Sequence, residues 1–149
     1  MAIATGKTAA WGKTGNVYLY VSSKRPPTEP DWNEYLAWLR ETAKETPIRT
    51  ELLSIVYDRS TGPNASQRKQ LTDATVNWKL RVAVVTPSTV ARGVVTAMNW
   101  FKKDAYEAFP PEEFNRAITF LGVPTSAATD VRQAVNALID LMDGAPAGR

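Results

Sequence analysis

The sequence predicts an α/β domain with a small, mainly parallel sheet of four or five strands and helices packed on it. Short apolar runs rich in β-branched and aromatic residues recur at 16–21, 51–57 and 80–85. Segments with apolar residues at helical spacing separate these runs. Strict alternation of strands and helices is typical of a parallel sheet covered by helices.

The first third of the chain is predicted to contain one clear strand and one amphipathic helix. Residues 1–14 are small and weakly patterned, so they form either a flexible leader or a first edge strand. The aromatic run 16–21 is a strand, and the prolines after it end the ladder. A helix should begin near 28–31 and close before Pro47, with one apolar stripe of Trp32, Tyr35, Leu36 and Leu39.

The middle of the chain repeats the strand–loop–helix order twice. Strand 51–57 leads through a polar loop into a helix that opens at Gly62 or Asn64 and runs to about Asn77. Strand 80–85 is almost continuously apolar, which indicates that both of its faces are covered. The next helix should start with Thr86 as N-cap, and its predicted buried stripe is Val90, Val94, Ala97, Met98 and Phe101.

The last third is predicted to hold a short strand and two helices. The strand covers 105–109, and a helix with a stripe of Phe114, Ala117, Ile118 and Leu121 follows and stops at Gly122. A final helix covers 126–142, and the tail 144–149 should be disordered. Residues 15–143 therefore form a single domain.

Composition excludes several classes of chemistry. The 149 residues contain no cysteine and no histidine, so disulfides, thiolate nucleophiles, imidazole bases and Cys/His zinc sites are excluded. The net charge of +3 is spread among alternating signs, which does not indicate a nucleic-acid partner. No signal peptide or run long enough to span a bilayer is found, so we expect a cytoplasmic protein without a transmembrane segment.

The loop after strand 51–57 holds the first candidate site. Asp58, Arg59, Ser60 and Thr61 follow the strand and precede a helix N-terminus. In open α/β sheets such loops lie at the carboxyl ends of the strands, where function is usually placed. A phosphate on Ser60 or Thr61 would meet free backbone N–H groups and a basic side chain. Capping and turning the chain explain the same residues without any further role.

A second cluster lies at the next strand-to-helix turn. Thr86, Ser88 and Arg92 should emerge at the same edge of the sheet as the loop at 58–64. Together with Arg59 and Arg68 they could ring an anion, ligand or peptide site, whereas Arg92 is equally explained as a solvated helix residue. Asp58 alone, without a second acid or a base nearby in sequence, does not indicate catalysis.

Two tryptophans fall off the predicted core stripes. Trp38 and Trp100 lie beside helical apolar residues but not in line with them. Aromatic residues in such positions are favoured at interfaces, so we expect one or both to contact a partner or a second copy of the chain.

The element order, with an Asp-x-Ser loop after the second strand, resembles the STAS domain family, including the anti-sigma-factor antagonists and their STAS/SEC14-like variants. The segments that carry the resemblance are IVYDRSTGPNASQRKQL, VAVVTPSTVARGVVTAMNWF and AFPPEEFNRAITFLGV. The antagonists present a phosphorylatable serine in a tighter Asp-Ser-Ser-Gly-like loop, whereas this loop carries Arg59 and Pro63.

The resemblance implies a non-enzymatic regulatory or scaffold module without a cofactor. It would bind a protein partner through the loop at 58–64 and the following helix, under control of Ser or Thr phosphorylation. The alternative is a carrier with a pocket for a small apolar or anionic ligand in the crevice at the strand ends. A hydrolase using Ser60 or Asp58 ranks last, because no base and no G-x-S-x-G elbow is present.

Overall fold

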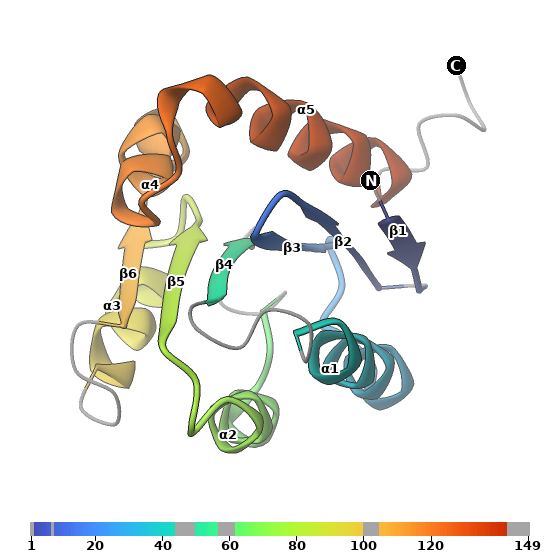
Figure 1. The fold of residues 1–149 in the computed structure, drawn as a ribbon. Helices are drawn as coiled ribbons and strands as arrows, with labels where there is room; N and C mark the ends of the chain where they lie inside the picture. The colour runs from blue at the N-terminus through green and yellow to red at the C-terminus, as the bar shows by residue number, and fades with distance from the viewer. Residues whose placement is uncertain (1, 7, 44–49, 57–61, 100–104, 143–149) are drawn as a thin grey trace.

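The computed structural model describes residues 2–6, 8–43, 50–56, 62–99 and 105–142 and shows one six-stranded sheet. Its strands lie side by side in chain order (Figure 1). The first three are joined antiparallel, and the third to the sixth run parallel. The strands are β1 Ala2–Thr5, β2 Ala9–Thr14, β3 Val17–Ser22, β4 Thr50–Ile55, β5 Leu80–Val85 and β6 Tyr106–Phe109. The prediction of an α/β fold with a mainly parallel sheet is thus confirmed, with six strands in place of four or five.

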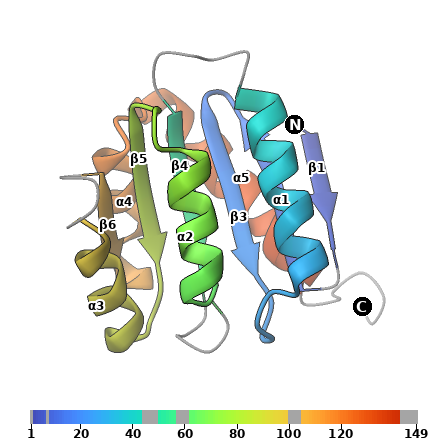
Figure 2. The same ribbon diagram turned by 90° about the horizontal axis from the view of Figure 1, so that it is seen from below.

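Helices cover both faces of the sheet. The three helices that connect the parallel strands, α1 Glu29–Ala43, α2 Ala65–Ala74 and α3 Thr89–Met98, lie on one face (Figure 2). The short η1 Pro111–Glu113 leads into α4 Phe114–Phe120, which packs with α5 Thr125–Met142 on the other face. Successive crossovers of one hand in a sheet with sequential strands place their helices on the same side. None of the described helices has the length and apolar character needed to cross a membrane.

Each parallel strand buries both of its faces, because alternate residues point to opposite sides of the sheet. Tyr18 and Tyr20 of β3 belong to the core under α1, α2 and α3, where Trp32, Tyr35 and Leu36 of α1 meet them. The other core is mainly aliphatic and lies under α4 and α5; its residues from the strands include Ala10, Val17, Leu19, Val21, Leu53, Ala83 and Val85. The predicted stripes of α1 and α4 are therefore confirmed.

The N-terminal segment departs from the expectation. Residues 1–14 were expected as a flexible leader or one edge strand, but they contain both β1 and β2. β2 pairs with β3 along its whole length, and Gly15 takes a positive φ of 56° in the turn between them. A residue without a side chain adopts this left-handed conformation without steric penalty.

Helix α3 also corrects the sequence interpretation. Its N-cap is Ser88, whose side chain accepts a hydrogen bond from Ala91 N, and not Thr86. Its buried residues are Ala91 and Val95, whereas Val90 is 56 % exposed. The predicted stripe through Val90, Val94 and Ala97 faces outward or is half-buried, and Phe101 lies outside the described residues.

Candidate functional site

The carboxyl ends of β4 and β5 lie side by side. Ile55 pairs with Val85 in the parallel ladder, and Val56 N donates to Val85 O at 3.0 Å. Each strand leads toward a helix N-terminus, α2 after β4 and α3 after β5. The two predicted clusters are thus attached to adjacent strand ends, as the parallel arrangement requires.

The N-terminus of α2 is closed by its own side chains. Asn64 Oδ1 accepts from Gln67 N at 2.8 Å, and Gln67 Oε1 accepts from Asn64 N at 2.9 Å, which forms a capping box. Gln67 is buried, and its Nε2 also donates to Pro27 O and Glu29 Oε1. Nη1 of Arg68 donates to Pro63 O at 2.8 Å. The guanidinium therefore ties the start of α2 to its own loop.

The turn before α3 is bonded in the same manner. Thr86 is fully buried, and its hydroxyl accepts a hydrogen bond from Ser88 N. Arg92 Nη1 donates to Thr86 O at 2.9 Å, and Nη2 donates to Thr89 Oγ1. Ser88 Oγ accepts from the helix at Ala91 N. The hydrogen bonds given for these side chains are thus all made within the turn and the first turn of α3.

Of the remaining predicted site residues, the structure describes only Trp38. Asp58, Arg59, Ser60, Thr61 and Trp100 lie outside the described residues. Trp38 is half-buried, and its ring packs against Tyr18 and Tyr35, with centroids 5.6 and 6.2 Å apart. Contact of Trp38 with a partner, or with a second copy of the chain, stays a prediction.

A cavity lies between the sheet and helices α1, α2 and α3, next to these strand ends. Its volume is about 80 Å³. Aromatic and aliphatic side chains form most of its wall, and Arg68, Ser54 and the start of α2 complete it. We call it the aromatic cavity. Its lining includes Tyr20, Trp32, Tyr35, Val56, Leu71, Val82, Val84, Ala91, Val95, Met98 and Tyr106. The sequence interpretation placed a ligand crevice at the strand ends but did not identify these residues.

Two residues that line the aromatic cavity carry buried polar atoms without a hydrogen-bond partner: Tyr20 Oη and Trp32 Nε1. Burial raises the pKa of Tyr20 and of Tyr35, and charge repulsion adds to both shifts. Burial also raises the pKa of Tyr106, and the neighbouring Thr72 side chain offsets part of that effect. All three phenols are therefore neutral at physiological pH, and neutral phenols are hydrogen-bond donors.

Asp31, which precedes Trp32 in α1, is a buried carboxylate. Asp31 Oδ2 accepts from Thr8 N at 2.7 Å and from Thr8 Oγ1 at 2.5 Å. After desolvation, its charge is the second cause of the raised pKa of Tyr20.

No group of three or more acidic side chains that could hold a metal ion occurs in the ranges that the structure describes. Comparisons with protein-family models, with curated proteins and with solved structures find no significant match.

Proposed function

We propose that the chain works by binding, and that it holds a small, largely apolar ligand in the aromatic cavity. The cavity itself carries this proposal, because well-formed apolar pockets with a few polar groups are the usual binding sites for small molecules. Its position at the carboxyl ends of parallel strands supports the same conclusion.

The cavity volume limits what the ligand can bury. A dry apolar cavity of roughly 150 Å³ accepts benzene, and the aromatic cavity has a volume of about 80 Å³. It therefore suits a short aliphatic or narrow planar group, with the remainder of a larger ligand extending past Pro63 and Arg68. The mostly hydrocarbon wall favours such groups through burial of apolar surface.

Filling the cavity tests the proposal. Ala91 is buried and lines the cavity, so Ala91→Leu places three more carbon atoms in it. Ala97 is exposed on the same helix, so Ala97→Leu is the matched control. Native mass spectrometry of protein purified from its own host should show a bound small molecule on the natural chain and on Ala97→Leu, but not on Ala91→Leu.

Two outcomes contradict the proposal. One is a natural chain that carries no adduct and shows no rise in melting temperature with small apolar compounds. The other is an adduct that survives in a correctly folded Ala91→Leu variant, since this places the ligand elsewhere.

A protein-binding role is the second candidate, and the exposed apolar side chain of Val90 favours it. Val90 lies in the first turn of α3, close to the strand ends. A STAS-like regulatory or scaffold module, cytoplasmic and controlled by phosphorylation at Ser60 or Thr61, would present this surface together with the loop at 58–64. Large exposed apolar patches with polar rims mark protein interaction sites, and Val90 would be one part of such a patch.

The test of this second role is Ser60→Asp, which adds negative charge to the loop. Partner binding, measured with proteins captured from the native host, should weaken while the melting temperature stays nearly unchanged. Equal capture by both forms would contradict the phosphorylation switch.

A further inference from the structure

The polar atoms in the wall of the aromatic cavity show what kind of ligand fits it. Tyr20 and Trp32 are each only 2 % exposed, and their rings meet edge to face with centroids 5.7 Å apart. Neither Tyr20 Oη nor Trp32 Nε1 has a partner. Buried polar atoms in folded proteins are almost always hydrogen-bonded, and an unmet donor destabilises the fold. A ligand oxygen that accepts hydrogen bonds from these two donors would therefore remove their unfavourable burial.

Charge decides the nature of that acceptor. Most of the cavity wall is hydrocarbon, and an anion is costly to bury against such a wall. An uncharged oxygen can accept hydrogen bonds from the two donors without that cost.

We propose that the aromatic cavity selects a neutral ligand with a carbonyl-type oxygen, which accepts hydrogen bonds from Tyr20 Oη and Trp32 Nε1. The aliphatic part of the ligand then lies against Leu71, Val84 and Val95. This inference rests on the proposed function, because it assigns the polar end of the same ligand. The inferred ligand is neutral, whereas the sequence left open an apolar or an anionic one.

Three small probes separate the contributions of shape, oxygen and charge. They are 2-hexanone, 2-methyl-1-hexene, in which a methylene group replaces the oxygen, and hexanoate. Titration is followed by the NMR signal of the Trp32 indole N–H, which lies in the cavity wall. We expect saturable shifts with 2-hexanone and binding of hexanoate at least about tenfold weaker, because an anion is costly to bury.

Tyr20→Phe removes one donor and leaves the ring in place. It should weaken 2-hexanone about five- to tenfold, the effect of one lost hydrogen bond, and leave 2-methyl-1-hexene unchanged. The melting temperature should stay the same or rise, because the lost hydroxyl had no partner in the folded chain. If Tyr20→Phe does not fold, Trp32→Phe removes the other proposed donor, and binding of the two neutral probes is then followed by the rise in melting temperature.

The matched control is Tyr18→Phe. Tyr18 lies two residues from Tyr20 on the same strand and does not line the cavity, so its variant should bind both neutral probes like the natural chain. The ratio of the affinities for 2-hexanone and 2-methyl-1-hexene in each variant is compared with the same ratio in the natural chain. The different hydration of the two probes cancels in this comparison, which isolates the contact to the oxygen.

Every other pattern overturns the inference. Equal effects of Tyr20→Phe on the ketone and the alkene mean that the hydroxyl only shapes the wall. No effect on either means that the donors are met by water, and hexanoate binding as tightly as 2-hexanone excludes neutral selectivity. In these cases the cavity still binds and the proposed function stands, whereas failure of all three probes to bind the natural chain removes both.

Discussion

Asp31 joins the N-terminal hairpin to α1, and its removal should strongly destabilise the fold. Asp31 is 8 % exposed, and both the backbone N and the hydroxyl of buried Thr8 donate to it. In Asp31→Ala both donors lose their charged acceptor. An orphaned buried donor costs about 1–3 kcal/mol, so two give a loss of about 4 kcal/mol in the free energy of unfolding.

The loss is measurable by urea and thermal unfolding. For a domain of this size, about 1 kcal/mol moves the melting temperature by roughly 2–4 °C, so the expected drop is about 8–16 °C. The dependence of the free energy on urea should keep its slope, because the surface exposed on unfolding is the same.

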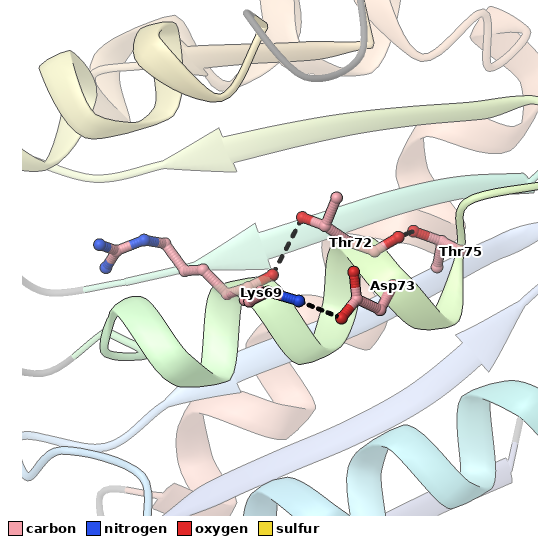
Figure 3. Close-up of polar contacts among 5 residues, drawn as sticks. Lys69, Thr72, Asp73 and Thr75 are labelled. Atoms are coloured by element: carbon pink, nitrogen blue, oxygen red, sulfur yellow. Dashed lines mark hydrogen bonds and ion pairs between the residues drawn. The ribbon is translucent and has the colours of Figure 1, made fainter.

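The matched control is Asp73→Ala on α2. Asp73 pairs with Lys69 at 2.7 Å (Figure 3). Both side chains are largely exposed. An exposed i,i+4 pair contributes only about 0.3–0.5 kcal/mol, so this variant should melt within about 2 °C of the natural chain. If Asp31→Ala were also within that range, burial and pairing of Asp31 would not stabilise the fold as argued.

Two glycine substitutions and one titration make further predictions. Gly6→Ala places its methyl group against the Asp31 carboxylate and should lower the free energy of unfolding by about 1–3 kcal/mol. Gly93 lies on an exposed part of α3, and a methyl group there meets no neighbour within 4 Å, so Gly93→Ala should raise the free energy of unfolding by about 0.5–1 kcal/mol. Urea unfolding measures both changes, and equal effects of the two substitutions would contradict both predictions. Burial raises the pKa of Tyr20 and Tyr35, so the folded chain keeps protons that the unfolded chain releases. Stability should therefore be complete below about pH 10 and fall above it by up to about 1.4 kcal/mol per pH unit for each tyrosine. Unfolding at pH 8, 10 and 11 checks the sign; phenolate absorbance from every tyrosine at pH 10 in a folded chain would contradict it.

Local signals were sufficient for much of the fold. β3, β4 and β5 are apolar, β-branched runs bounded by turn residues, and the structure confirms them. Asn64 followed by Gln67 three positions later is the spacing of a capping box, and α2 begins there. Such features depend only on neighbours in the chain.

Other elements depend on contacts between distant segments. Ala9, Ala10 and Gly12 have little preference for strands, and β2 exists because β1 and β3 pair with it on either side. Helix α3 has an apolar side chain on almost every face, so its periodicity could not show that Ala91 and Val95 would face the sheet.

The aromatic cavity could not be predicted for the same reason. Its wall combines β3, β4, β5, β6, α1, α2 and α3, and no spacing within one segment shows that they meet. The one available signal was the clustering of large aromatics in 18–20 and 32–38, which indicates a crowded layer under α1.

The placement of α5 has a consequence for synthesis on the ribosome. This helix packs across β1, β2 and β3, which precede it by about a hundred residues. Until it emerges, the aliphatic side of β3, with Val17, Leu19 and Val21, has no cover, although the opposite side can already be closed by α1. The nascent chain thus passes through a stage in which one face of the sheet is covered and the other exposes apolar side chains that chaperones can bind.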